Sequence, residues 1–347
     1  MGITTRFIRS IIILLIMKKH KTAWLIFTFI ISSCQPVKET TQGSIERSDP
    51  TLDQIISPNA HVEVIAKGYD WSEGPVWVKD KKMLLFSDVP KNSIYKWTEE
   101  KGAELYLTPS GYTGHVPRGG EPGSNGLLIS AKEQLVLCQH GDRRIALMNA
   151  GLDYPSADFT TLADNYHGKK FNSPNDAVFD SKGNLYVTDP PYGLLKLEKD
   201  PAKETPFQGV YKVYPNGKVT LLTDTLTRPN GIAISPDEKF LVISNSDPAK
   251  ARWYRYELKD SSIISGKIFY DATASLATEK GLPDGLKIDS HGTLFATGPG
   301  GMFIFNPEGK VLGKIKLPQP ASNCALGEDE KTLYVTSDMY LLRLKMR

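Results

Sequence analysis

PNDAVFDSKGNLYVTD (174–189) is one of six similar stretches, and their recurrence indicates the architecture of the chain. Each has a polar or small turn, a short apolar run, a second turn and a second apolar run that ends in polar or small residues. The other five copies are SEGPVWVKDKKMLLFSD (72–88), SNGLLISAKEQLVLCQHG (124–141), PNGIAISPDEKFLVISNSD (229–247), PDGLKIDSHGTLFATG (283–298) and SNCALGEDEKTLYVTSD (322–338). Self-similarity at a regular spacing is typical of repeat architectures.

One polar residue recurs at the start of the first apolar run in every copy. These six anchor residues are Glu73, Asn125, Asn175, Asn230, Asp284 and Asn323, separated by 52, 50, 55, 54 and 39 residues. Such spacings suit propeller blades of four strands. Two more strand-like runs follow each copy, except that only YLLRLKM (340–346) follows the last one.

The strand missing from the sixth repeat is available near the other end of the chain, in HVEVIAKG (61–68). Its pairing with the last repeat would close the ring without an exposed edge. We therefore expect an all-β fold, a six-bladed β-propeller over residues 58–347, with an N-terminal strand closing the last blade. Six anchors argue against a five- or seven-bladed ring or a looser array of sheets.

The amino terminus has the pattern of an export signal. From Met17 the chain has a basic start, an apolar run (22–31) and the residues Ile-Ser-Ser-Cys ending at Cys34. The apolar run is too short to span a bilayer comfortably. Its end resembles a bacterial lipobox, in which the cysteine is lipidated after cleavage. The alternatives are an uncleaved membrane anchor or a plain secretory signal with an incidental cysteine.

These features predict how the chain is organised and where it is found. We expect an export signal over residues 1–34 with lipidation at Cys34, a flexible tether over 35–57, and a location in the periplasm or cell envelope. Translation from Met17 rather than Met1 is a further hypothesis. The sequence does not indicate an oligomeric state.

Composition narrows the classes of partner. The formal net charge is +3, but the first 33 residues contain five basic residues and no acidic one, so the remainder carries −2. A small net charge without a lysine or arginine block argues against a nucleic-acid partner. Three cysteines exclude a disulfide framework. We expect a small-molecule ligand, and membrane contact only through the lipid anchor.

The anchors also carry chemistry. The first strand of each blade runs nearest the axis of a propeller, so the six anchors should converge at one mouth of the central channel. Asn and Asp also favour turns for purely structural reasons, but Glu73 is not a turn residue. Two carboxylates with several amides suit a hard divalent cation, Ca²⁺ first, with Mg²⁺, Mn²⁺ or Zn²⁺ as alternatives. No cluster of His or Cys supports a structural zinc site.

Long loops should cover the same mouth. The loop 109–123 carries His115 and Arg118, and a loop from 189 to 209 carries Tyr192. The shorter CQHGDRR (138–144) supplies His140 and Arg143. Structured loops over a site are commonly lids or specificity elements. For each lone histidine or arginine, the alternative is an ordinary surface or turn role.

Four motifs resemble those of the gluconolactonase, or regucalcin (senescence marker protein), family. They are SEGPVW (72–77), FNSPND (171–176), RPNG (228–231) and LPDG (282–285). CQHGDRR and TDPPYGL (188–194) are similar to the microbial gluconolactonase branch. The resemblance covers about residues 60–345 and implies a six-bladed propeller with one divalent cation at its axis.

The resemblance also implies residue roles. Glu73, Asn230 and Asp284 would be metal ligands, Asn175 would contact metal or substrate, and Asp284 would also be the catalytic acid and base. The chain departs from regucalcin at substrate-contacting positions. Ser173 stands where regucalcin has an arginine, and Asn125 and His140 belong to the microbial pattern.

The implied function is a divalent-cation-dependent hydrolase that opens sugar lactones. We expect Asp284 to take a proton from water and return it to the leaving ring oxygen. The expected substrate-binding residues are Asn125, Asn175, His140, Arg143, His115, Arg118 and Tyr192. The alternatives are a non-catalytic envelope propeller that binds a sugar or calcium, and a hydrolase of other esters at the same metal site.

Overall fold

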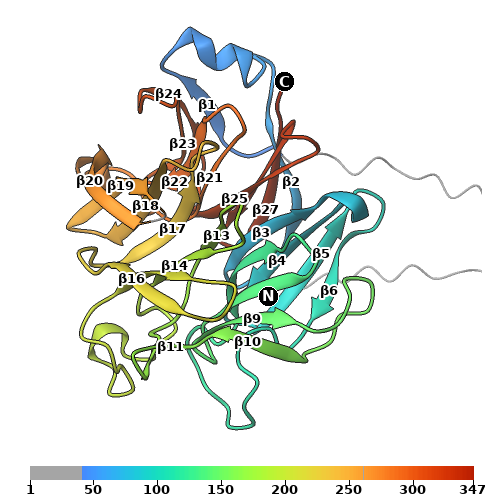
Figure 1. Ribbon diagram of the computed structural model, residues 1–347. Helices are drawn as coiled ribbons and strands as arrows, with labels where there is room; N and C mark the ends of the chain where they lie inside the picture. Colours follow the sequence, from blue (N-terminus) through green and yellow to red (C-terminus); the bar gives the residue numbers. More distant parts are fainter. Residues whose placement is uncertain (1–40, 261) are drawn as a thin grey trace, which may run out of the picture. The chain divides into compact units, whose positions relative to one another are not determined.

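The computed structural model describes residues 41–260 and 262–347, which form six antiparallel sheets around one axis (Figure 1). Blade 1 consists of β3 (Ser72–Val78), β4 (Met83–Asp88), β5 (Ser93–Thr98) and β6 (Gly102–Leu107). Blade 2 consists of β7 (Ser124–Ile129), β8 (Leu135–Gln139), β9 (Arg144–Met148) and β10 (Phe159–Ala163). Blade 3 consists of β13 (Ala177–Phe179), β14 (Leu185–Asp189), β15 (Gly209–Val213) and β16 (Val219–Thr223).

The second half of the ring follows the same plan. Blade 4 consists of β17 (Pro229–Ile234), β18 (Phe240–Asp247), β19 (Lys250–Lys259) and β20 (Ser262–Asp271). Blade 5 consists of β21 (Leu286–Ile288), β22 (Leu294–Gly298), β23 (Gly301–Phe305) and β24 (Val311–Lys316), joined at its outer edge by β1 (Ser44–Arg47). Blade 6 consists of β25 (Ala321–Gly327), β26 (Thr332–Ser337), β27 (Tyr340–Lys345) and β2 (Val62–Lys67).

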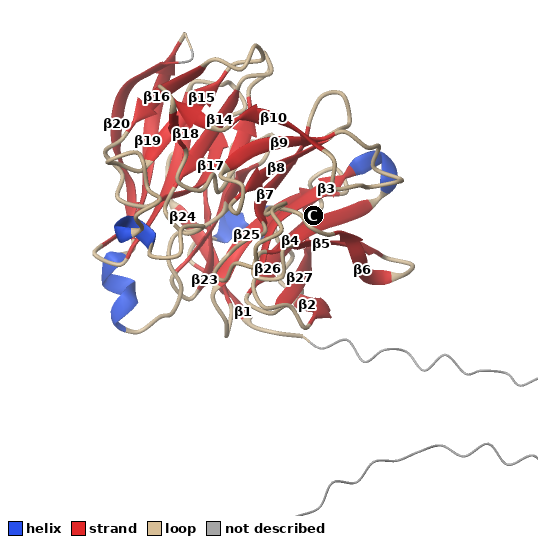
Figure 2. Ribbon diagram, turned by 90° about the horizontal axis from the view of Figure 1, so that it is seen from below, coloured by secondary structure: helices blue, strands red, loops and turns tan. Residues whose placement is uncertain are grey.

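Smaller elements lie in the connections between strands, and the short helical segments are blue in Figure 2. A short hairpin pairs β11 (Asn165–Tyr166) with β12 (Lys169–Lys170). The helical segments among residues 41–260 and 262–347 are short 3₁₀ helices: η1 (Pro50–Gln54), η2 (Lys79–Lys81), η3 (Leu197–Lys199) and η4 (Thr273–Ala277). In the described part of the chain, no helix is long and apolar enough to cross a membrane.

The first strands hold the ring together and confirm the six-bladed propeller. Each first strand packs against the first strand of the next blade, and β25 of blade 6 packs against β3 of blade 1. The predicted closing strand is also confirmed, because β2 pairs antiparallel with β27, with Val62 opposite Leu344 and Val64 opposite Leu342. The ring is therefore closed by strands from both ends of the chain.

The tether prediction differs from the structure between residues 44 and 57. Here β1 pairs with β24, and Leu52 and Ile56 are fully buried against blades 5 and 6. Asp49 caps η1 by accepting from the Thr51 amide, with Pro50 at the first turn. A few apolar side chains in a polar stretch were enough to dock it. The predicted signal over residues 1–34 and the lipidation site Cys34 lie outside the described residues.

The core lies between the blades, in six hydrophobic clusters that each join two neighbouring blades. Large rings fill these spaces. Trp77 of blade 1 stacks on Tyr334 of blade 6 with ring centroids 5.4 Å apart, and Trp253 of blade 4 contacts Phe303 of blade 5 at 5.3 Å. The packing that fixes one blade against the next therefore also fixes the anchors relative to one another.

Candidate functional site

The anchors project from irregularities at the starts of the first strands. In blades 1, 2, 4 and 6 the pairing between the first and second strands shifts by one extra residue at the anchor. Such a bulge interrupts the ladder and re-aims a side chain. Asn175 and Asp284 lie just before β13 and β21. The anchors are thus released from regular pairing where the strands enter the channel.

Glycines allow neighbouring anchors to approach. A Cβ atom at Gly74, which has a φ of +48°, would lie 1.9 Å from the Asn125 carbonyl oxygen. A Cβ atom at Gly231 would lie 2.3 Å from the Asp284 carbonyl oxygen. Any larger residue would therefore push adjacent first strands apart. The glycines after Glu73 and Asn230 therefore allow the anchor of the next blade to lie close to each of them.

Hydroxyl groups near the ends of the second strands hydrogen-bond to the main-chain carbonyls of three anchors. Ser87 donates to the Asn125 carbonyl at 2.9 Å, Thr188 to the Asn230 carbonyl at 2.6 Å and Ser244 to the Asp284 carbonyl at 2.6 Å. Each bond runs from one blade to the next. The buried main chain at the channel mouth is therefore satisfied, which leaves the anchor side chains to face the pocket.

The pocket at this mouth has a volume of about 300 Å³ and brings five of the six anchors together. It is lined by Trp71, Glu73, Glu121, Asn125, Asn175, Tyr192, Asn230, Ser246, Gly281, Leu282, Asp284, Pro320 and Ala321. The sixth anchor, Asn323, is buried and accepts from the Cys324 amide instead, with its Oδ1 3.4 Å from Lys287 Nζ. The site is polar on the anchor side and apolar at Trp71, Leu282 and Pro320.

The donor set fits a hard cation. Within the described residues, Oδ1 of Asn125, of Asn175 and of Asp284 are buried without a hydrogen-bond partner. Burial raises the pKa of both Glu73 and Asp284. The negative charges of Asp176 and Glu121 raise both pKa values further, and that of Glu73 also raises the pKa of Asp284. Buried oxygens without partners and crowded carboxylates are costly alone, and a divalent cation offsets both costs. We find no group of three or more His, Cys, Asp or Glu side chains arranged for a metal in residues 41–260 and 262–347. The amides would have to complete the ligand set.

Two pocket side chains, Asn230 and Tyr192, are each held in one hydrogen-bonding state by their surroundings. The Asn230 amide donates from Nδ2 to Ser246 Oγ at 2.9 Å, which turns its Oδ1 away from Ser246. Ser246 in turn donates to the Pro283 carbonyl. Burial and the nearby Asp284 carboxylate raise the pKa of Tyr192, so its hydroxyl remains a hydrogen-bond donor at neutral pH.

Three of the expected substrate-binding residues lie elsewhere. Arg143 is buried, and its guanidinium donates to the carbonyls of Phe171, Asn172 and Ala202, because these loop carbonyls would otherwise lack donors. Arg118 donates to the carbonyls of Gly141 and Gly193 and thereby fastens the loop 109–123. His115 and Arg118 line a separate, shallow hollow. The two arginines hold loops in place, and none of the three side chains lines the anchor pocket.

His140 lies just behind the pocket wall. It is fully buried, and its Nδ1 is 3.2 Å from Oε2 of Glu121, which does line the pocket. Sequence reasoning missed Glu121, Trp71 and Ser246 as site residues. Glu121 lies within the predicted lid loop, and Trp71 directly precedes the SEGPVW motif. The sequence therefore places both residues near the site, but it does not show that their side chains point into the pocket.

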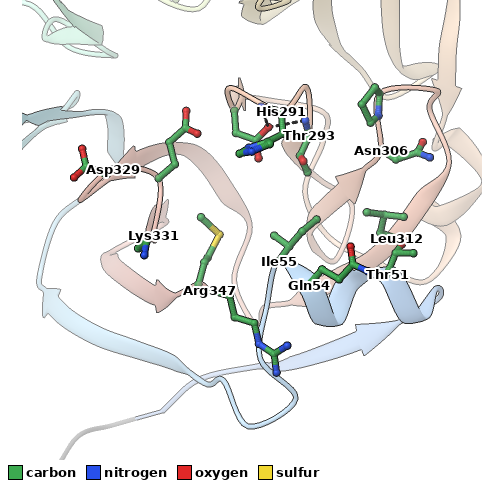
Figure 3. A pocket seen from close by; sticks show the side chains of 14 residues that line it. Thr51, Gln54, Ile55, His291, Thr293, Asn306, Leu312, Asp329, Lys331 and Arg347 are labelled. Carbon is green, nitrogen blue, oxygen red and sulfur yellow. Dashed lines mark hydrogen bonds between the residues drawn. The ribbon is translucent and has the colours of Figure 1, made fainter.

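A second pocket, of about 510 Å³, lies at the other end of the blades (Figure 3). It is formed by η1, the end of the chain and turns of blades 5 and 6, including His291, Asn306 and Arg347. Its acidic groups already have partners: Asp289 accepts from the amides of His291 and Thr293, and Glu330 accepts from Ser290. This pocket therefore lacks the unsatisfied oxygens that mark the anchor site.

Comparison with known proteins agrees with this geometry. Residues 71–339 match the family described as SMP-30/Gluconolactonase/LRE-like region. A gluconolactonase of Zymomonas mobilis is 39% identical over 334 residues, which cover 92% of this chain and 91% of that protein. The structure of a gluconolactonase from Xanthomonas campestris is 26% identical with a TM-score of 0.76, and the match covers 90% of this chain and 99% of that one.

A calcium-binding regucalcin from Agrobacterium tumefaciens shares the fold, with a TM-score of 0.63 and 17% identity over 81% of this chain and 92% of that one. Fold and pocket together define a six-bladed propeller with a carboxylate and amide site at its axis. The chain belongs to the SMP-30/gluconolactonase/LRE-like family. The resemblance inferred from four sequence motifs is confirmed.

Proposed function

We propose that the protein hydrolyses sugar lactones with one divalent cation, Ca²⁺ in preference to Mg²⁺, Mn²⁺ or Zn²⁺. The main observation in favour of the cation is that buried anchor oxygens without hydrogen-bond partners line one pocket together with two carboxylates. Glu73, Asn175, Asn230 and Asp284 would hold the cation. The reaction class is supported by the gluconolactonase relatives, and the cation by the calcium-binding regucalcin of the same fold.

The chain's own residues supply positioning and proton transfer. A divalent cation in this pocket would supply Lewis acidity towards a carbonyl oxygen. Asp284 accepts a proton from the attacking water through its carboxylate and returns it to the ring oxygen as the carbon–oxygen bond breaks.

The remaining pocket residues orient the substrate and limit water. Asn125 presents an amide and Tyr192 a protonated hydroxyl to the pocket. Trp71, Leu282 and Pro320 cover one side with apolar surface. Pockets that combine an apolar wall with a few fixed polar groups are suited to holding a small ring in one orientation.

The test is hydrolysis of a panel of sugar lactones, with and without a chelator, by the wild type and Asp284→Asn. We expect activity that is lost on chelation, restored by Ca²⁺ and at least about a hundredfold lower in the variant, since general acid–base groups contribute about 10²- to 10⁴-fold. Equal turnover by the wild type and the variant would overturn the mechanism. Tight lactone binding without turnover would favour the non-catalytic sugar- or calcium-binding alternative.

One observation favours a second candidate reaction. The apolar wall of Trp71, Leu282, Pro320 and Ala321 would suit a less polar ester at the same cation site. Aryl esters and unsubstituted lactones, assayed beside the sugar lactones, separate these substrate classes. A preference for the aryl esters of tenfold or more in kcat/KM would favour the second reaction.

We also propose that the propeller is exported and anchored by lipid at Cys34. The support is the basic, apolar and Ile-Ser-Ser-Cys succession in residues 17–34. Expression of the full chain with a labelled fatty acid should give a labelled membrane-associated protein, and Cys34→Ser should abolish the label. Label that persists in the variant would contradict lipidation at this residue.

A further inference from the structure

Glu121 is a pocket carboxylate that the proposed reaction does not use. It lies in the loop 109–123, and its side chain is 35% exposed while that of His140 behind it is fully enclosed. The distance from Glu121 Oε2 to His140 Nδ1 is 3.2 Å. The carboxylate thus has one edge against a buried imidazole and remains accessible to a ligand in the pocket.

Glu121 is not one of the six anchors, but it lines the same pocket as Glu73 and Asp284. Glu121 reaches this pocket from the loop 109–123, whereas Glu73 and Asp284 reach it from the starts of first strands. Within residues 41–260 and 262–347, these three carboxylates do not converge as a group of three around one point. A pocket carboxylate outside the ring of anchors is placed to meet another part of the substrate.

The loop that carries Glu121 is fastened on both sides. Arg118 donates to the carbonyls of Gly141 and Gly193, and the His140 amide donates to the Gly123 carbonyl at 3.1 Å. A Cβ atom at Gly193 would come within 2.8 Å of the His140 Cβ, so the imidazole is closely packed there. The His140 ring and the main chain that carries Glu121 therefore have little freedom left to lose when a ligand binds.

His140 has polar capacity that the protein leaves unused. Neither ring nitrogen makes a hydrogen bond of good geometry within the described residues, although the ring is completely buried. Burial of an imidazole without hydrogen bonds is unfavourable. A ligand that draws the Glu121 carboxylate into line with Nδ1 would remove part of that cost.

We propose that Glu121 and His140 form a polyol subsite in which Glu121 accepts hydrogen bonds from lactone hydroxyls and His140 positions the carboxylate. The inference rests on the proposed lactone hydrolysis and names its substrate class, a ring that carries adjacent hydroxyls. A carboxylate has two oxygens and can accept from two such hydroxyls. The apolar surface of Trp71, Leu282 and Pro320 supplies a wall for the carbon–hydrogen face of the ring.

The test compares two six-membered lactones on the wild type and Glu121→Gln. δ-Gluconolactone carries hydroxyls, whereas δ-valerolactone has the same reacting group and none. We expect Glu121→Gln to lower kcat/KM for δ-gluconolactone about 10- to 100-fold, mainly through KM, and to change that for δ-valerolactone less than threefold. An equal fall for both lactones would place Glu121 in the chemistry and overturn the subsite. His115→Gln, in the same loop but outside the pocket, is the matched control and should alter neither.

A binding measurement separates this inference from the proposed function. The cyclic ether analogue of δ-gluconolactone keeps the ring and its hydroxyls but has no carbonyl to attack. Calorimetry should show that Glu121→Gln binds it at least about tenfold more weakly than the wild type does. This result is expected even if the wild type hydrolyses no lactone, an outcome that would overturn only the proposed reaction. Equal binding by both proteins would overturn the subsite.

The role of His140 has its own readout. His140→Phe keeps a ring in the buried space but removes Nδ1, and it should weaken binding of the ether analogue by less than Glu121→Gln does. The double variant should bind no more weakly than Glu121→Gln alone, because a positioning residue acts through its partner. Additive losses would contradict positioning. If His140→Phe does not fold, His140→Gln provides the same comparison.

Discussion

The two mouths of the central channel are built from the same six strands yet have opposite chemistry. One mouth collects Glu73, Asn125, Asn175, Asn230 and Asp284. A few residues further along, the same strands line the other mouth with apolar side chains such as Val76, Leu127, Val178, Ile232 and Ile288. Bulges and glycines at the strand starts release polar side chains, whereas regular pairing beyond them presents branched ones.

Lys287 connects the two mouths. It lines the apolar end, but its Nζ lies 3.6 Å from Asp176 Oδ2 and 3.4 Å from Asn323 Oδ1. The Lys287 ammonium is therefore a fixed positive charge beneath the ring of anchors. It lies close to Asp176, the residue that follows Asn175. The proposed cation site therefore has a fixed charge below it as well as the polar groups of the anchor ring around it.

Glu73→Gln should give the largest change, because it removes one of two buried charges from the polar mouth. We expect Ca²⁺ affinity, measured by calorimetry, to fall about 100-fold or more, the scale for loss of one partner of a buried charge pair. Val76→Ala on the same strand is the control and should leave affinity unchanged. A loss in the control as large as in Glu73→Gln would show that the two mouths are not separate.

Stability of the cation-free protein should depend on pH because of the same carboxylates. Burial raises the pKa of Glu73 from 4.5 to about 8, so the folded state holds a proton that the unfolded state has released. Stability is then fully present below about pH 4.5 and should be lost progressively as the pH rises towards 8.

Thermal melts of chelated protein should therefore show a melting temperature that falls across this range, by less in Glu73→Gln. Added Ca²⁺ should reverse the loss, because binding favours the ionised carboxylates. A melting temperature that rises with pH in the chelated wild type would contradict the raised pKa.

Lys287→Met tests the charge beneath the ring. The pair with Asp176 is 29% exposed on the lysine side, so we expect a modest loss of about 1 to 2 kcal/mol in the free energy of unfolding. Ca²⁺ affinity should rise by about three- to tenfold, because the negative charge of Asp176 is no longer balanced. Lys287→Arg keeps the charge and is the control. A fall in affinity for Lys287→Met would show that the lysine supports the site by packing alone.

Ile232→Val should give the smallest effect. Ile232 is buried at the apolar mouth, and loss of one methylene there costs about 0.5 to 1.5 kcal/mol of stability. Denaturant unfolding should detect this cost, while Ca²⁺ affinity and turnover should match the wild type. A change in affinity would mean that packing at the apolar mouth reaches the anchors.

The sequence predicted most of the framework because the signals are local and repeated. Each repeat shows the same order of strand, turn and anchor within a short stretch of sequence. Six copies of this order make the repeat assignment secure. The closing strand β2 was predictable because the last repeat lacked one. The docked segment 44–57 was missed because a single buried residue such as Leu52 in a polar stretch does not form a pattern.

Loop side chains were less predictable than strand side chains. Arg143 and Glu121 lie in loops at the same mouth, yet Arg143 donates to main-chain carbonyls while Glu121 lines the pocket. The direction of each side chain depends on which hydrogen-bond partners from distant parts of the chain are available. Those partners are brought near only when the loops pack. Ser246 joins the site through its bond with Asn230, a contact across strands that neither residue's neighbours in sequence reveal.

The sequence by itself therefore determined the six-bladed ring, its closure and five anchors of the pocket, since backbone periodicity and bulge-prone motifs act over a few residues. The tertiary structure alone decided that Asn323 turns away, that Arg118 and Arg143 fasten loops, and that Glu121 backed by His140 completes the pocket wall. Those outcomes depend on competition for hydrogen-bond partners between segments far apart in the chain, which exists only after the blades have packed.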